Sequence, residues 1–220
     1  ISMDDGDDEV DAVDRRGLDV HDDAQSTDGA LWRRVTDLYP LPRSLSGDGV
    51  RATLARLQEE LPLTVHEVPT GTPVLDWTIP DEWNLRRATL TAPDGRVVAD
   101  TDVHALHVVG YSDPVDLHLD RDALEPHLFS LPDRPQWIPY RTAYYAEDWG
   151  FCLQHERLQT LAEGEYEVCI DATLADGSLS YGECFLPGET DHEVLVSCHV
   201  CHPSLANDNL AGIAVATRLA

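Results

Sequence analysis

Residues 193–212 constrain the fold and the chemistry of this chain more than any other part of the sequence. A short apolar run at 193–197 is typical of a strand buried in a parallel sheet. The run ends directly in a cluster of cysteine and histidine residues. Because ligand sites in open α/β sheets form where strands end, this cluster marks a candidate site. The pattern therefore predicts an α/β fold with a buried strand at 193–197.

After the cluster, apolar residues return at helical spacing and predict a helix. The repeating positions are Leu210, Ile213, Ala214 and Thr217. Either Asn207 or Asp208 is a suitable N-cap for this helix, because a side-chain oxygen can accept a bond from its first free N–H groups. Capping would hold the Asp208 carboxylate close to the end of the strand.

The side chains of the cluster are of the kinds that zinc accepts as ligands. His199 and His202 offer imidazole nitrogens, Cys198 and Cys201 offer sulfur, and Asp208 offers oxygen. Three other interpretations compete for this segment. The order Cys-x-x-Cys-His at 198–202 matches the attachment pattern of c-type haem. A zinc ribbon would need a second pair of ligands, and the other cysteines are scattered singly. The thiols and imidazoles can also serve as ordinary packed or surface groups, with Asp208 as a helix cap only.

The rest of the chain is predicted from its periodicity. Helical spacing predicts helices at 31–39 and 50–61, and a strand is predicted at 63–68. Short β-prone runs at 88–90, 97–98, 106–109 and 168–170 indicate a β-rich module between 74 and 175, with a short helix at 153–161. A further strand is predicted at 181–186. Five cysteines without a visible export signal favour free thiols or metal ligands over disulfides.

The charge balance restricts the partners and the cellular environment. The chain has 220 residues and a net charge of −26, and all 15 basic residues are arginine. No basic stripe exists to neutralise phosphates, so nucleic acid is excluded as a partner. Such a charge is best tolerated where concentrated salt screens it, so we hypothesise a salt-loaded, halophilic cytoplasm; an acidic surface and tail in an ordinary cell is the alternative.

The sequence shows no targeting signal. Residues 1–28 hold eleven acids and predict a solvated, disordered acidic tail. A signal peptide needs a positive start and an apolar centre, and this segment has neither. No apolar run approaches the roughly 18 residues of a spanning helix, so we expect a cytoplasmic protein without a membrane partner.

Five dispersed stretches resemble an uncharacterised aminopeptidase-like family. They are YPLPRSLSGDGVR at 39–51, EVPTGT at 67–72 with DWTIP at 76–80, WGFCL at 149–153, YGECFLPG at 181–188 and CHPSLANDN at 201–209. The family is related to the zinc aminopeptidases of the glutamate-carboxypeptidase and transferrin-receptor type. The resemblance implies an αβα zinc-peptidase-like domain with an inserted all-β domain. The expected organisation is a tail at 1–29, a first peptidase-like segment at 30–75, the insert at 76–175 and the resumed, incomplete peptidase-like domain at 176–220.

The same resemblance implies ligands and a reaction. In the related enzymes a histidine after a strand binds one metal and an aspartate before a helix bridges two, which assigns the bridging role to Asp208. His202 is favoured for the histidine, with His199 second. The implied function is hydrolysis of a peptide or small amide by a zinc-activated water. The general base and the remaining ligands would follow Ala220, so we expect the amino-terminal part of a longer enzyme.

One alternative function and the oligomeric state stay open at this point. The alternative is a non-catalytic peptide- or carbohydrate-binding protein with a vestigial metal site. The sequence leaves a homo-oligomer open.

Overall fold

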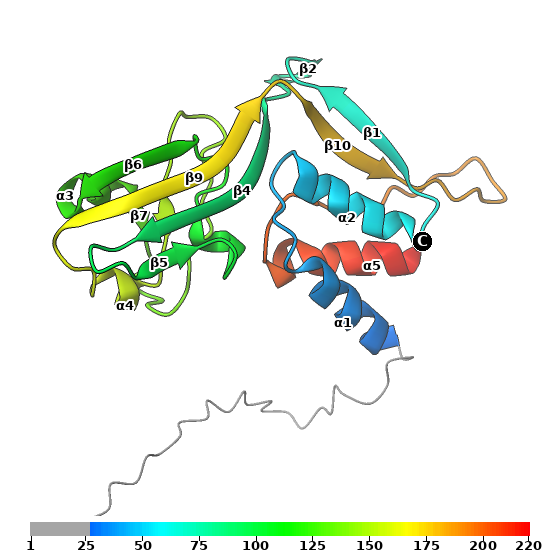
Figure 1. Cartoon of the computed structure of the whole chain (residues 1–220). Coiled ribbons are helices and arrows are strands. Elements are labelled where there is room, and N and C mark those ends of the chain that lie inside the picture. Colours follow the sequence, from blue (N-terminus) through cyan, green and yellow to red (C-terminus); the bar gives the residue numbers. More distant parts are fainter. Residues whose placement is uncertain (1–26) are drawn as a thin grey trace, which may run out of the picture.

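The chain forms two lobes that are joined by long strands (Figure 1). A computed structural model describes residues 27–220. The helix lobe comprises α1 (Thr27–Leu38), α2 (Asp48–Gln58), β1 (Thr64–Pro69), β10 (Ser178–Glu183) and α5 (Ala211–Leu219). The sheet lobe comprises the elements between 82 and 175. Its strands are β4 (Glu82–Thr91), β5 (Val97–Asp100), β6 (Val115–Asp120) and β9 (Glu165–Ala175).

The sheet lobe is built on a four-stranded antiparallel sheet with the order β5-β4-β9-β6. In β9, alternate side chains are buried from Tyr166 to Ala172, as expected where one sheet face covers a core. Opposite this face lie the short elements of the lobe. They are η1 (Ala105–His107), α3 (Arg121–Leu124), η2 (Glu125–His127), β7 (Leu128–Phe129), β8 (Phe151–Cys152) and α4 (His155–Leu158). Leu124 and Phe151 are fully buried in the core that they share with the sheet.

The helix lobe has a smaller apolar core. Leu38 of α1, Leu57 of α2 and Ile213 of α5 meet there, together with Leu210 from the turn η3 (Ala206–Leu210). Their spacing places one apolar face of each helix toward the others. Gly47 precedes α2 with a φ of 94°, and a side chain there would lie 2.3 Å from the Trp83 carbonyl oxygen. Glycine at this position therefore lets the loop before α2 lie directly against β4 of the sheet lobe.

An ion-pair network fastens the two lobes where β9 continues into β10. Arg51 of α2 donates two hydrogen bonds to the carboxylate of Glu82 in β4, at 2.7 and 2.6 Å. Arg51 also donates to Glu67 of β1 at 3.2 Å, and the Ser178 amide donates to Glu82 at 2.9 Å. Hydrogen bonds from Arg51 above all lower the pKa of Glu82 from 4.5 to about 2.

This lowered pKa predicts an acid-sensitive junction between the lobes. The ionised Glu82 stabilises the fold above its ordinary pKa, and that stabilisation is lost as the pH falls from about 4.5 to about 2. We expect Glu82→Gln to be less stable than the wild type at pH 7 and to match it near pH 2. Denaturant unfolding at a series of pH values measures this difference. Glu163→Gln, at an exposed position, should follow the wild-type profile, and a Glu82→Gln profile parallel to wild type would contradict the assignment.

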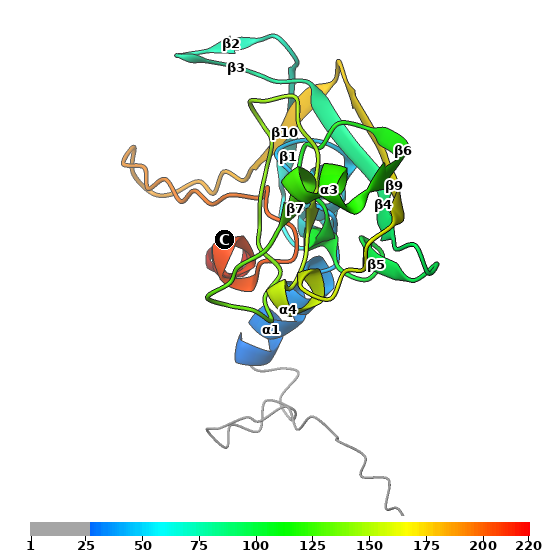
Figure 2. The ribbon, with the colours of Figure 1, turned by 90° about the vertical axis from the view of Figure 1, so that its left-hand side faces the viewer.

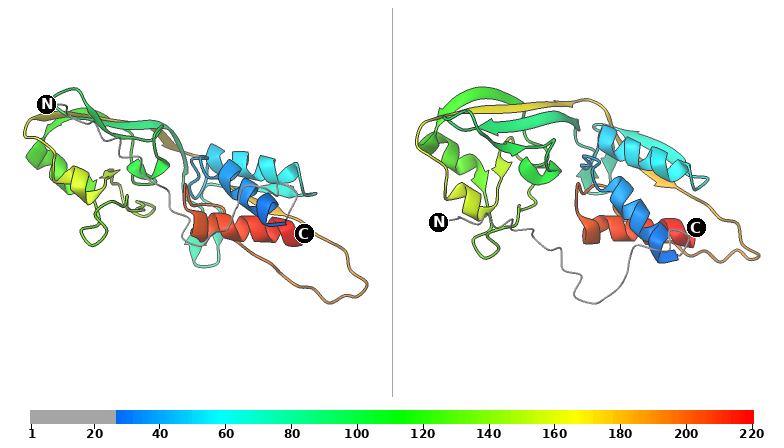
Figure 3. Two further views of the ribbon diagram at one scale, coloured as in Figure 1. Left: turned by 90° about the horizontal axis from the view of Figure 1, so that it is seen from below. Right: turned by 60° about the horizontal axis from the view of Figure 1, so that its bottom comes forward.

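Two segments extend away from the lobes. The hairpin of β2 (Pro73–Val74) and β3 (Trp77–Thr78) projects beyond the β1–β10 pair, and Leu75 at its tip is fully exposed (Figure 2). Residues 184–200, which follow β10, form an extended segment without helix or strand that runs outward before the chain returns to α5 (Figure 3). Val194 and Leu195 are each 91 % exposed in it.

Most of the predicted elements are confirmed, and two are wrong. The helices expected at 31–39, 50–61 and 210–217 correspond to α1, α2 and α5, and the runs at 88–90, 97–98 and 168–170 lie in β4, β5 and β9. The helix expected at 153–161 is reduced to the four residues of α4, and the strand expected at 181–186 is β10, which ends at Glu183. Of residues 106–109, Leu106 and His107 lie in η1 and Val108 forms only an isolated bridge with Phe151, so no strand is present there. The buried strand predicted at 193–197 is an exposed, unpaired segment, because no neighbouring strand of residues 27–220 lies beside it.

The predictions for the tail, the cysteines and membrane-spanning helices can be compared with residues 27–220. Residues 1–26 of the predicted acidic tail lie outside the described residues, and α1 begins at Thr27. All five cysteines are free. Among residues 27–220, no helix is both long and apolar enough to cross a membrane.

Candidate functional site

The structure brings His202 and Asp208 together. The Nδ1 atom of His202 lies 3.1 Å from Oδ1 of Asp208, and the two side chains are 19 % and 70 % exposed. Asp208 lies inside η3 with non-helical φ and ψ of −121° and 92°. Its side chain does not cap α5, so the predicted capping by Asn207 or Asp208 is wrong. The Asp208 carboxylate instead turns back toward the imidazole six residues before it.

His199 and the two cysteines of the cluster are placed differently. His199 is exposed, and its ring centroid lies 6.1 Å from that of His202. Cys198 is exposed, with its Cβ atom near the position that a Gly212 side chain would take. Cys201 is half-buried, and this burial raises the pKa of its thiol. Of the two candidate histidines, His202 is therefore the one that lies beside Asp208.

A buried arginine holds the backbone next to His202. Arg43 is only 1 % exposed, and its Nε donates a hydrogen bond to the His202 carbonyl oxygen at 3.0 Å. Its Nη1 donates to the Leu38 carbonyl oxygen at the end of α1. The hydroxyl of Ser204 donates to the Tyr39 carbonyl oxygen at 3.2 Å. The loop that joins α1 and α2 thus supports the loop that carries His202.

The charge of Arg43 is retained at neutral pH although it is buried. Desolvation lowers the pKa of Arg43 to about 10. Sequence reasoning did not select Arg43 as a site residue, because it lies 159 positions before His202. The available signal was a single arginine inside the otherwise apolar and small-residue stretch 40–47, which belongs to the first stretch of the family resemblance.

A tyrosine from the sheet lobe borders His202 on another side. The ring centroid of Tyr140 lies 5.0 Å from that of His202, with the rings inclined at 67°. The Tyr140 and Tyr144 hydroxyl oxygens are 3.1 Å apart. Burial raises the pKa of both phenols, so both stay protonated at neutral pH. The candidate site is therefore formed by both lobes.

The donors of this site fit part of a zinc site. The 3.1 Å between His202 Nδ1 and Asp208 Oδ1 is a hydrogen-bond distance, and it is also close to the separation of two ligands that each bind one zinc ion at about 2.0–2.2 Å. Within residues 27–220, no three His, Cys, Asp or Glu side chains are grouped closely enough to hold a metal. Near this pair, Nη2 of Arg43 and both side-chain polar atoms of Asn209 are buried without a hydrogen-bond partner in the described chain. Such atoms are costly unless water or another group pairs with them.

Comparison with known proteins places the chain in a family. A family model described as a domain of unknown function (DUF4910) matches residues 32–220, which include both lobes and the candidate site. The chain belongs to this family. A curated relative and a solved crystal structure, both from Clostridium acetobutylicum, are similar to this DUF4910 chain.

The first relative is named "Putative polysaccharide biosynthesis protein with aminopeptidase-like domain". It is 42 % identical over 197 residues, which cover 90 % of this chain and 45 % of the relative. The second is a crystal structure named for a "putative peptidase", with 40 % identity and a TM-score of 0.87, covering 91 % of this chain and 47 % of that one. The DUF4910 chain thus spans slightly less than half the length of each relative, and it shares the fold of the corresponding half of the crystal structure.

Proposed function

We propose that this chain contributes His202 and Asp208 to the zinc site of a peptidase-like hydrolase that cleaves a peptide or small amide. The observation that carries the proposal is the 3.1 Å contact between the two side chains at the junction of the lobes. The names of the curated relative and of the crystal structure, which mention an "aminopeptidase-like domain" and a "putative peptidase", support the same reaction class. In this proposal the fold is the αβα zinc-peptidase-like domain with residues 76–175 as its insert.

The residues of the site hold the metal, support its loop or limit access to it in the proposed reaction. When bound, zinc lowers the pKa of water toward neutrality and polarises a carbonyl group. His202 and Asp208 would hold the metal, and the remaining ligands and the general base would come from the part of the relatives that this chain does not span. Arg43 and Ser204 fix the backbone on which His202 and Pro203 lie. Tyr140 limits access to His202 from the sheet lobe.

Metal content tests this proposal directly. We expect the full-length protein, purified in concentrated salt, to contain zinc in a fixed ratio to protein, and Asp208→Ala to have lost it, because the carboxylate is a ligand and not a cap. Elemental analysis gives the ratio, and removal of the zinc by a chelator should abolish amide hydrolysis.

The control is Asp191→Ala, which removes an exposed carboxylate from the extended segment and should leave the zinc content unchanged. Wild-type protein without zinc, or an unaltered zinc content in Asp208→Ala, would contradict the proposal and favour a binding protein without catalysis.

A further inference from the structure

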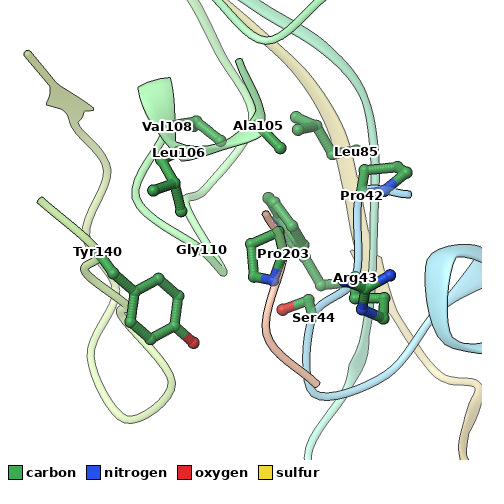
Figure 4. A pocket seen from close by; sticks show the side chains of 11 residues that line it. Pro42, Arg43, Ser44, Leu85, Ala105, Leu106, Val108, Gly110, Tyr140 and Pro203 are labelled. Atoms are coloured by element: carbon green, nitrogen blue, oxygen red, sulfur yellow. The ribbon is translucent and has the colours of Figure 1, made fainter. Parts of the chain in front are cut away.

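A small pocket opens between the two lobes beside His202. Figure 4 shows Pro42 and Ser44 of the helix lobe on one side, Leu106 and Val108 of the sheet lobe on the other, and Tyr140 across from Ser44. Pro203, the residue after His202, projects between them. The pocket therefore shares two walls, Tyr140 and Pro203, with the candidate metal site.

The volume of the pocket limits what it can hold. The pocket is partly open to solvent, and its free volume of about 20 Å³ is enough for one water molecule or a group about as large as a methyl. The indole of Trp83 and the aliphatic side chains form most of the wall, so an apolar group gains free energy by entering. A leucyl or aromatic side chain is too large unless the wall moves.

The charges around the pocket exclude an ammonium group. No aspartate or glutamate of the described chain lines it. The one charged residue in the wall is Arg43, whose guanidinium donates to the carbonyl oxygens of Leu38 and His202. A positive group in the pocket would be repelled by Arg43 and would find no counter-charge. The occupant is therefore uncharged as well as small.

We propose that this pocket binds a small apolar group on the acyl side of the amide that the site cleaves. The inference rests on the proposed function, because it takes the metal site beside His202 as the place of reaction. A methyl group in this position belongs either to an alanyl residue, where it is attached to the α-carbon, or to an acetyl group, where it is attached to the carbonyl carbon; the shared chemistry is a methyl on the acyl side of the scissile bond. Substrates with glycyl, alanyl or acetyl groups should thus be preferred over leucyl ones.

Gly110 offers a way to fill the pocket without disturbing the backbone. A Cβ atom at Gly110 would lie 3.5 Å from the nearest atom, Cγ2 of Thr142, and 3.9 Å from Oγ of Ser44, both ordinary contacts. We expect Gly110→Ala to lower kcat/KM for alanine p-nitroanilide relative to glycine p-nitroanilide at least about tenfold, which is the effect of one methylene in an apolar pocket. Leu106→Ala enlarges the pocket. It should raise the ratio of kcat/KM for leucine p-nitroanilide to kcat/KM for alanine p-nitroanilide by a similar factor.

The matched control is Gly188→Ala, where a Cβ atom meets nothing within 4 Å; it should keep the wild-type order of substrates. If the protein cleaves 4-nitroacetanilide and Gly110→Ala lowers that kcat/KM as well, the group bound in the pocket is acetyl. If 4-nitroacetanilide is not cleaved, the group is alanyl. An order of substrates that is the same in the wild type, Gly110→Ala and Leu106→Ala would overturn the pocket assignment while leaving the proposed hydrolase intact.

A binding measurement separates the pocket from the reaction if no substrate is cleaved. Trp83 lines the pocket, and its indole N–H donates to the Ser112 carbonyl oxygen at 2.9 Å, which gives one assignable NMR signal. Titration of the full-length protein with alaninamide should shift this signal in the wild type and not in Gly110→Ala, and leucinamide should not shift it. If the protein shows this binding pattern but hydrolyses no amide, the pocket assignment is supported and the proposed function is contradicted. Absence of the shift in an inactive protein would overturn both.

Discussion

His202→Ala is expected to lower kcat/KM for amide hydrolysis at least about a thousandfold in the full-length protein. A metal ion supplies several kcal/mol of stabilisation to the charge that develops in the transition state, and each 1.36 kcal/mol corresponds to a factor of ten in rate. Loss of the imidazole beside Asp208 should remove the metal and this stabilisation with it. Zinc content, measured on the same preparation, should fall in parallel.

His199→Ala is the matched control, since it removes the same side chain three positions earlier. His199 is exposed, with its ring centroid 6.1 Å from that of His202, so we expect less than a tenfold change in kcat/KM and an unchanged zinc content. The reverse pattern, with the larger loss in His199→Ala, would show that the ligand was assigned to the wrong histidine. Wild-type activity in both variants would exclude a metal ligand at either position.

Arg43→Ala is expected to reduce the free energy of unfolding by about 3 kcal/mol or more. The substitution leaves the partly buried His202 carbonyl oxygen without this donor and the Leu38 carbonyl oxygen with the Leu41 N–H alone, and a buried group left unsatisfied costs about 1–3 kcal/mol. It also leaves a cavity, because Arg43 is among the largest fully buried side chains. Denaturant unfolding gives the stability, and amide hydrogen exchange over 201–209 should show earlier opening of the loop that carries His202.

Two further arginine variants make this result specific. Arg86 lies on the surface of the sheet and pairs with Asp171, so Arg86→Ala should change the stability little. Arg43→Lys keeps the charge but replaces the planar guanidinium by a single ammonium group. Its free energy of unfolding should lie between those of the wild type and Arg43→Ala. If Arg43→Ala is as stable as Arg86→Ala, the arginine does not support the site in the way described.

The sequence predicted the local parts of this structure well because they depend on neighbouring residues. The apolar spacing in α1, α2 and α5 follows from the helical period, and the alternation in β9 follows from the pleat of a strand. The cluster around His202 and Asp208 was likewise visible, because both lie in one short segment. His202 is preferred to His199 only through a family resemblance; the structure places His202 beside Asp208, and its role as a ligand stays a prediction.

The parts that were missed depend on contacts between distant residues. Arg43 and Tyr140 reach His202 from a different loop and from the other lobe, and neither has a local pattern that marks it as a site residue. The strand predicted at 193–197 shows the opposite error. Its apolar side chains indicate a preference for burial, but a strand also needs a partner with free N–H and C=O groups, which the run itself does not reveal.

The extended segment that carries Val194, Leu195 and Val196 has a consequence for how this chain behaves in isolation. Its unpaired backbone and apolar side chains form a template on which a second molecule can add a strand, as exposed sheet edges do in aggregation. The net charge of −26 keeps such molecules apart by mutual repulsion. Added salt screens that repulsion, so we expect rising ionic strength to permit self-assembly of the isolated chain through this segment. If salt also stabilises the fold, as hypothesised from the charge balance, colloidal stability and folding stability change in opposite directions with ionic strength.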